Sequence, residues 1–197
     1  MTTNFFDSNS YFIDEKVNMF KFANEYKVFD NKGTQIGAIK QRLTTGQKML
    51  RLVVSKAMLP FHLEIVNEKD QVQASINRGW TFFMSSIIIS DYKGAKIAEI
   101  KQKFKLFKPR FIINDKNSRL IAEINGDWKA WNFNITDPQQ KPVGQISKKW
   151  AGAMKEIFTT ADKYNVTIEE AYPETDHKAA IVSCAICIDM ILKENNS

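Results

Sequence analysis

Two cysteines near the C-terminus are spaced as in a redox motif, Cys184-x-x-Cys187. A redox pair of this kind sits at a helix N-terminus, where exposure and the helix dipole lower the thiol pKa. Here the pair lies in the middle of a long apolar run, which favours two small hydrophobic residues packed one helical turn apart in a core. Zinc would need two further ligands, and His62 and His177 are the chain's only histidines. The sequence therefore predicts neither redox chemistry nor zinc binding at these cysteines.

Asp189 is a second residue with potential chemistry, because it interrupts the same apolar run. A buried carboxylate must be hydrogen-bonded, ion-paired or protonated, so we expect it to meet a Lys, an Arg or a Trp N–H of the surrounding wall. An acid on a lipid or proton path is disfavoured, because no second titratable partner stands at helical spacing. The chain also lacks a Ser/His/Asp elbow, a Walker loop, a G-x-G-x-x-G turn and an H-E-x-x-H pair, so we expect no enzyme and assign no catalytic residue.

The strongest charge feature is the run KQKFKLFKPR from Lys101 to Arg110. In a strand, Lys101, Lys103 and Lys105 share one face while the residues between them share the other. Such a row either keeps a surface solvated or contacts anionic lipid, where each Lys or Arg contributes about 1 kcal/mol near a negative membrane. The candidate anionic-lipid-binding residues are Lys101, Lys103, Lys105, Lys108, Arg110, Lys148 and Lys149.

Composition supports one domain with a sizeable core, since 44% of the 197 residues are hydrophobic. The 28 basic and 22 acidic side chains leave a net charge of +6, which favours anionic partners such as lipid headgroups, nucleic acid or phosphorylated ligands. The N-terminus shows no basic region followed by an apolar one, so no secretory signal is expected. A cytoplasmic location is therefore predicted.

Five stretches repeat one pattern, in which an alternating run, a polar turn with Asp, Asn or Gly, and a second run with a small residue follow one another. Period-two alternation marks strands, and these turn residues are typical of β-hairpins. The hairpins begin at Tyr26, Phe61, Ile87, Phe111 and Phe133. Further strands are expected at Tyr11 to Lys16, Met49 to Ser55 and around Ile157 and Val166. The total is about twelve strands.

The stretch from Asp176 to Glu194 predicts a helix that is apolar around its whole circumference. Asp176 suits the N-cap, and Lys193 suits the last turn. The apolar run of about 14 residues would be about 21 Å long, too short for a bilayer core of roughly 30 Å. A helix buried in the protein is therefore favoured over a transmembrane anchor.

A closed sheet can bury such a helix on all sides and leaves no edge strands. We therefore predict a mainly β fold, a closed antiparallel β-barrel of about twelve strands around a central hydrophobic C-terminal helix. Residues 1–10 are predicted as an N-terminal tail and residues 11–197 as a single domain. The predicted core residues of the helix are Ala179, Ile181, Val182, Cys184, Ala185, Ile186, Ile188, Asp189, Ile191 and Leu192.

Three motifs in fixed order near the C-terminus resemble the signature of the phospholipid scramblase family. They are GQISKKWAG from Gly144, KEIFTTAD from Lys155, and an apolar terminal helix with an Ile-Asp pair. The upstream hairpins resemble LURP-one-related and tubby C-terminal-like proteins, so the similarity covers Tyr11 to Glu194. The resemblance implies a twelve-stranded barrel threaded by its C-terminal helix, in agreement with the prediction above. It also implies calcium-dependent movement of phospholipid between leaflets, or phosphoinositide headgroup binding.

The resemblance places the family's calcium segment on residues 160–168. Calcium takes six to eight oxygen ligands, usually several of them carboxylates. Thr160 stands where the family carries an Asp, and Lys163 puts a cation beside Asp162. Asp162 is the one candidate metal ligand, so calcium is expected to bind weakly or not at all, and no other cofactor is expected.

These observations predict a non-enzymatic, scramblase-like domain that associates peripherally with anionic phospholipid membranes, with a role in phospholipid scrambling left open. The expected partners are anionic phospholipid or phosphoinositide headgroups, met at the inner face of the plasma membrane. The alternative is a protein-interaction or nucleic-acid-binding module of the LURP-one-related type that uses the same basic surface. Nucleic acid is disfavoured, because most of the chain's tryptophans are expected in the barrel core. The sequence predicts no oligomeric state.

Overall fold

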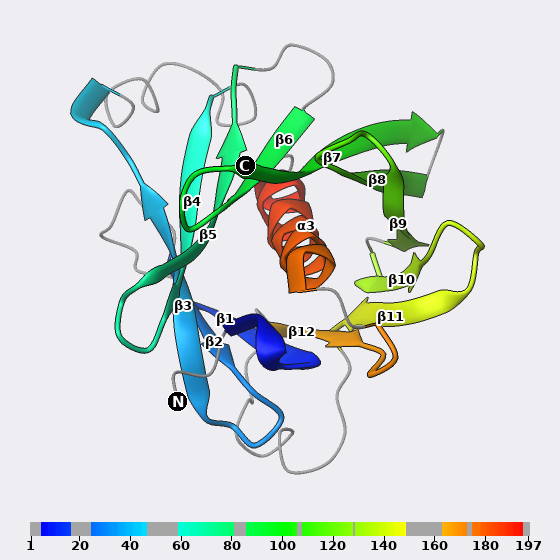
Figure 1. The fold of residues 1–197 in the computed structure, drawn as a ribbon, viewed down its shortest axis with the longest axis horizontal. Coiled ribbons are helices and arrows are strands. Elements are labelled where there is room, and N and C mark those ends of the chain that lie inside the picture. The colour runs from blue at the N-terminus through cyan, green and yellow to red at the C-terminus, as the bar shows by residue number, and fades with distance from the viewer. Residues whose placement is uncertain are drawn as a thin grey trace.

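The computed structural model describes residues 5–16, 25–46, 59–80, 86–105, 108–127, 129–148, 163–172 and 175–194. Its strands form one closed antiparallel barrel, in which each strand pairs with its neighbours in the chain and β1 pairs with β12 (Figure 1). The elements are η1 (Phe5–Asp7), β1 (Ser10–Lys16), β2 (Glu25–Phe29), β3 (Gln35–Arg42), β4 (Phe61–Asn67), β5 (Val72–Arg78), β6 (Ser86–Asp91), β7 (Lys96–Lys105), β8 (Lys108–Asp115), β9 (Leu120–Asp127), β10 (Asn132–Thr136), β11 (Pro142–Ser147), β12 (Lys163–Ile168) and α3 (Thr175–Glu194). The predicted fold class is confirmed.

The five predicted hairpins are present, and all of them turn in the same way at one end of the barrel, the turn end. An Asp or Asn opens each turn, and its side-chain oxygen accepts hydrogen bonds from the backbone N–H groups two and four residues later, at 2.8–3.0 Å. The residue three positions later has positive φ, which Gly33 and Gly94 adopt without a Cβ penalty. The opening residues are Asp30, Asn67, Asp91, Asp115 and Asp137.

A small residue stands seven positions after each of these turn residues, opposite a Val or Ile of the preceding strand. These small residues are Gly37, Ala74, Ala98, Ala122 and Gly144. A Cβ on Gly144 would come within 2.3 Å of the Thr167 carbonyl oxygen, and one on Gly37 within 2.1 Å of the Val66 carbonyl oxygen. Alanine is accommodated on three hairpins, whereas the close approach of a neighbouring backbone requires glycine on the other two.

Helix α3 runs through the interior of the barrel and packs mainly against β7 and β8 (Figure 1). Every side chain from Ala179 to Ile191 is at most 7% exposed, which confirms the buried core helix. The helix begins at Thr175, one residue before the predicted start, and the side chain of Leu192 lies outside those described. In the described ranges, no helix has the length and apolar content needed to cross a membrane.

The N-terminal segment differs from the predicted tail over residues 1–10. Phe5 and Phe6 of η1 are each 3% exposed, and η1 packs against α3. The Phe5 ring also stacks on Tyr11, with ring centroids 5.7 Å apart. Burying two aromatic rings against α3 is more favourable in free energy than exposing them to water. The tail prediction overlooked this contribution. The strands expected at 49–55 and around Ile157 lie outside the described residues, whereas Val166 lies in β12 as predicted.

Candidate functional site

Strand β7 carries the predicted lysine row toward the barrel end opposite the turns. Lys101 and Lys103 are exposed, whereas Gln102 between them is 5% exposed, as the alternation of a barrel strand requires. The side chain of Lys105 lies outside those that the structure describes. The two described lysines therefore point outward from the barrel wall.

Lys101 pairs with the Glu99 carboxylate, which two further side chains also contact. Its ammonium nitrogen is 3.5 Å from Glu99 Oε1, and Glu99 also accepts hydrogen bonds from Ser86 Oγ at 2.5 Å and Lys96 Nζ at 3.0 Å. The Ser86 hydrogen bond, followed by the contact with Lys96, holds the pKa of Glu99 below its usual range. The Glu99 side chain is 16% exposed and that of Lys101 is 50% exposed, so the cation meets solvent and the anion lies beneath it.

Arg110 of β8 is held in a two-pronged ion pair with Glu123 of β9. Arg110 Nε donates to Glu123 Oε2 at 3.1 Å, and Nη2 donates to Oε1. The Glu123 side chain is only 7% exposed, whereas that of Arg110 is 32% exposed. Because an unpaired buried carboxylate is costly, the first role of Arg110 is to compensate Glu123. Its charge is thus only partly available to an outside anion, which the sequence did not reveal.

Lys148 lies at the same barrel end but on a different part of it, directly after β11. Its ammonium group lies 4.7 Å from the centre of the Trp131 ring, a cation–π contact. Strands β8, β9 and β10 separate β11 from β7, which corresponds to about 19 Å around the sheet at roughly 4.8 Å per strand. The predicted basic residues therefore share one end of the barrel without forming one cluster. The side chains of Lys108 and Lys149 lie outside those described.

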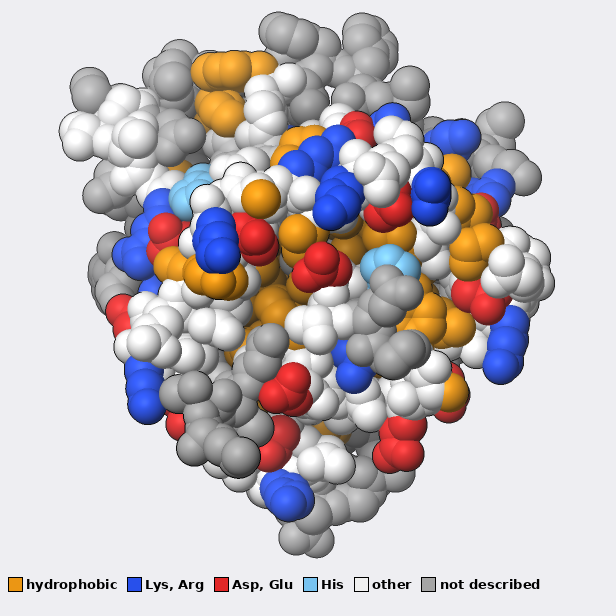
Figure 2. Space-filling model, in the orientation of Figure 1, with side chains coloured by type: hydrophobic (Ala, Val, Ile, Leu, Met, Phe, Trp, Pro, Cys, Tyr) orange, Lys and Arg blue, Asp and Glu red, His pale blue; other side chains and the backbone are white. Residues whose placement is uncertain are grey.

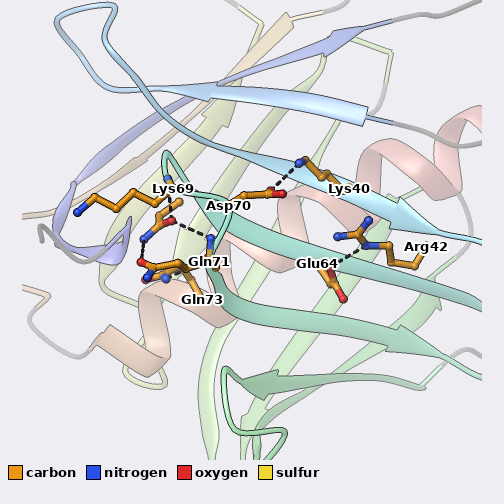
Figure 3. A network of polar contacts seen from close by, with 8 residues as sticks. Lys40, Arg42, Glu64, Lys69, Asp70, Gln71 and Gln73 are labelled. Carbon is orange, nitrogen blue, oxygen red and sulfur yellow. Dashed lines mark hydrogen bonds and ion pairs between the residues drawn. The ribbon is translucent and has the colours of Figure 1, made fainter.

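A basic residue that the sequence reasoning missed extends from β3 at the same end. Arg42 Nε donates to Glu64 Oε2 at 2.8 Å (Figure 3), and His62 Nε2 lies 3.5 Å from Glu64 Oε1. The side chain of Arg42 is 54% exposed, against 21% for Glu64. Twenty-two residues separate Arg42 from Glu64 in the sequence. Only the register between β3 and β4 brings them together, so no local pattern could have indicated the pair.

Three ion pairs of the outer wall share one orientation along the barrel, whereas Lys96 lies on the turn-end side of Glu99 and Lys163 pairs with Asp14 at the same level. In each of three pairs, the carboxylate stands two residues nearer the turn end than its cation and is the less exposed partner: Arg42 with Glu64, Lys101 with Glu99, and Arg110 with Glu123. In the Lys40–Asp70 pair, 2.5 Å apart, the carboxylate also lies nearer the turn end, but here it is the more exposed partner, at 61% against 30% (Figure 3). We call the resulting set of outward cations at the end opposite the turns the cationic rim, formed by Arg42, Lys101, Lys103, Arg110 and Lys148.

An exposed tryptophan lies at the same end of the barrel. Trp80 follows β5 and is 54% exposed, whereas Trp128 and Trp150 lie outside the described residues, so the expectation that the core holds most tryptophans stays a prediction. Trp131 fits that expectation better, because it is half-buried and packs 5.1 Å from the Tyr164 ring. Figure 2 shows that Lys and Arg side chains are interspersed with Asp and Glu on the face in view, so no face seen there is purely cationic.

The polar residues of the core helix have structural surroundings. Asp189 is 1% exposed and makes an interaction within the protein; our prediction that its partner is a Lys, an Arg or a Trp stays a prediction. Cys184 and Cys187 are completely buried. Burial, with a smaller contribution from Cys187, raises the pKa of the Cys184 thiol well above its usual value. Such a thiol is protonated and unreactive, as the core interpretation predicts.

Asp162, the candidate calcium ligand, lies outside the described residues, so the expectation for calcium stays a prediction. Among the residues that the structure describes, no three His, Cys, Asp or Glu side chains are grouped in a way that could hold a metal ion.

A family model described as Scramblase matches residues 13–195 of the chain. The chain belongs to the Scramblase family. This scramblase-family domain is 22% identical to a phospholipid scramblase family protein of Schizosaccharomyces pombe over 72% of its length, and 25% identical to phospholipid scramblase family member 5 of Homo sapiens over 58%. It is also 22% identical to altered inheritance rate of mitochondria protein 25 of Saccharomyces cerevisiae over 86%. The domain spans 40%, 44% and 64% of the lengths of these three proteins, respectively.

The fold of the scramblase-family domain is similar to the X-ray structure of a protein from Arabidopsis thaliana. The TM-score is 0.52 with 8% sequence identity, over 95% of this chain and 93% of that one. At this identity the likeness bears on the fold alone. The family match confirms the resemblance seen in the C-terminal motifs. It supports a scramblase-like, lipid-related function at the level of the family, whose proteins are generally not enzymes.

Proposed function

We propose that this scramblase-family domain is a non-enzymatic module that associates peripherally with anionic phospholipid membranes through the cationic rim. The observation that carries the proposal is the outward, exposed position of Lys101 and Lys103 on β7. Family membership supports phospholipid as the ligand class. The cytoplasmic leaflet of the plasma membrane carries the negative surface potential that such a rim requires, so its inner face is the proposed location.

The expected strength of this association is modest. At up to about 1 kcal/mol for each basic residue near a negative surface, Lys101 and Lys103 of the rim, with the neighbouring Lys105 and Lys108, would together contribute at most about 4 kcal/mol. This free energy corresponds to a dissociation constant of about 1 mM. Binding should therefore be reversible and should weaken with salt, because the Debye length falls from about 30 Å at 0.01 M salt to about 8 Å at 0.15 M.

Autonomous scrambling of lipids is the more demanding form of the proposal. The side chains from Ala179 to Ile191 are buried inside the barrel, where they form the core against which the strands pack. Moving lipid between leaflets through α3 would require the helix to leave the barrel, at the loss of this packing. We therefore propose membrane association and not scrambling by the isolated domain.

Flotation with vesicles tests the proposal. The wild-type domain should float with vesicles of equal parts phosphatidylcholine and phosphatidylserine at low salt, and should remain at the bottom with phosphatidylcholine alone. Raising the salt concentration should release it. Phosphoinositide in place of phosphatidylserine would separate headgroup recognition from general charge attraction. Failure to float with anionic vesicles at low salt would refute the proposal, and binding to a nucleic acid or a protein instead would support the alternative module.

A further inference from the structure

The two ends of the barrel present different charge arrangements to a flat surface. At the turn end, the Asp side chains of the turns lie among lysines such as Lys93 and Lys116, and Asp176 lies in the first turn of α3. At the opposite end, the cations of the rim project outward, and the carboxylates that pair with Arg42, Lys101 and Arg110 lie deeper and closer to the middle of the barrel. The pairs Arg42–Glu64, Lys101–Glu99 and Arg110–Glu123 therefore lie with their positive end toward the rim, and Glu99 also pairs with Lys96 on its turn-end side.

The consequence of this order can be estimated. Two residues along a strand span about 7 Å, which a strand tilt of about 40° reduces to about 5 Å along the barrel axis. With a Debye length of about 8 Å, a charge 5 Å farther from an anionic plane feels roughly half the potential. An ion pair whose cation lies nearer the membrane is therefore attracted to the anionic surface with about half the strength of a lone cation. An ion pair whose carboxylate lies nearer the membrane is repelled. Lys103, with no ion pair among the described residues, adds its full attraction.

Trp80 lies where it would contact a membrane that faces the cationic rim. The register pairs Arg78 with Ile87 and Ile87 with Ile100, so the end of β5 lies level with the lysines of β7. Two strand spacings, about 10 Å, separate these strands. Tryptophan is favoured at membrane interfaces, because its ring is largely apolar while its N–H remains hydrogen-bonded. Among the described residues of the turn end, Tyr92 is an exposed aromatic residue, 65% exposed, with the Lys93 ammonium group 5.3 Å from its ring centre.

We infer that the barrel docks end-on and rim first, with the Trp80 ring entering the headgroup region of a bilayer that contains anionic phospholipid. The inference rests on the proposed function and adds to it an orientation and an apolar contact residue. The turn end, with Tyr92, then faces away from the membrane.

Fluorophores at the two ends test the orientation. Gly79→Cys places a thiol beside Trp80 at a position where an added Cβ meets nothing within 4 Å, and Tyr92→Cys marks the turn end. Both natural cysteines are buried, so a polarity-sensitive thiol dye should react at the introduced site alone. Each labelled protein is mixed with vesicles of equal parts phosphatidylcholine and phosphatidylserine, and its sedimentation with the vesicles is measured in parallel.

The expected result is a blue shift of the dye at Gly79→Cys and none at Tyr92→Cys, with both proteins bound. A shift at the turn end, or at neither position, in proteins that do bind would overturn the orientation and leave the proposed function standing. Absence of binding by the unlabelled wild type would instead remove the proposed function and the inference with it. In addition, Trp80→Ala should weaken binding roughly tenfold without changing its salt dependence, whereas Tyr92→Ala should bind as wild type does. An unchanged affinity of Trp80→Ala would also overturn the inference.

Discussion

Replacing Arg110 with Met tests whether the ion pairs of the rim are structural as well as electrostatic. The substitution keeps the apolar stem of the side chain and removes its charge, which leaves the Glu123 carboxylate, 7% exposed, without the guanidinium. Breaking a fully buried pair costs about 3–5 kcal/mol and an exposed pair contributes at most about 1 kcal/mol. Because the Arg110 side chain is 32% exposed, we expect a loss of about 2–3 kcal/mol in the free energy of unfolding. At about 2–4 °C per kcal/mol for a chain of this size, Tm should fall by about 4–12 °C.

The companion variant is the double substitution Arg110→Met with Glu123→Leu. It removes both charges and replaces them with apolar side chains of similar size in the barrel wall. Its stability should return to within about 1 kcal/mol of wild type, because no buried charge is left uncompensated. Urea unfolding followed by circular dichroism measures the single variants Arg110→Met and Glu123→Leu and the double variant, and Lys103→Met serves as an exposed control that should change little. The reasoning is wrong if Arg110→Met is as stable as wild type, or if the double variant loses the sum of the two single losses.

Three further predictions concern the core, the hairpins and calcium. Ala185→Arg should abolish soluble expression, because this residue of α3 is 0% exposed and an unpaired charge cannot be accommodated there; a soluble, cooperatively folding variant would contradict the central position of the helix. Gly144→Ala should cost about 1–3 kcal/mol in urea unfolding, because its Cβ would lie 2.3 Å from a backbone oxygen, whereas Gly79→Ala, with open space around it, should not; equal stability of the two would refute this reading. Calorimetric titration should show no micromolar calcium binding, and such binding, lost in Asp162→Ala, would overturn the expectation.

Much of the fold could be predicted because its hairpins and its helix are encoded by residues close together in the sequence. Period-two alternation and turn residues identified the five hairpins, and the all-round apolar pattern of 179–192 identified a helix that had to be enclosed. The contribution of Phe5 and Phe6 escaped prediction, because a short apolar pair before the first strand has no periodicity from which to read its place. Glycine is required at Gly144, whereas the equivalent position of another hairpin accommodates Ala98. The difference depends on how closely the neighbouring backbone approaches, which the sequence alone does not reveal.

The candidate site was predicted less completely, because it depends on register. Alternation alone places Lys101 and Lys103 on the outward face, and this prediction is in agreement with their exposure. The pairs that join Arg42 to Glu64 and Arg110 to Glu123 cross between strands, so no spacing within one strand indicates them. Their common orientation appears only when the pairs are compared along the barrel.

The most direct test of the central claim compares two triple charge reversals in vesicle flotation. One variant carries glutamate at Lys101, Lys103 and Lys105. The matched control carries glutamate at three exposed lysines of the turn end, Lys32, Lys116 and Lys141, so both variants have the same net charge.

At low salt, the account predicts that the first variant loses at least about 100-fold in binding to anionic vesicles, since three attractions of about 1 kcal/mol each become repulsions. The control should keep most of the wild-type binding and the wild-type unfolding temperature, whereas the first variant should unfold at a slightly lower temperature because Lys101→Glu sets a second carboxylate beside Glu99. Equal losses in the two variants would contradict the account, because attraction would then follow net charge and not the cationic rim.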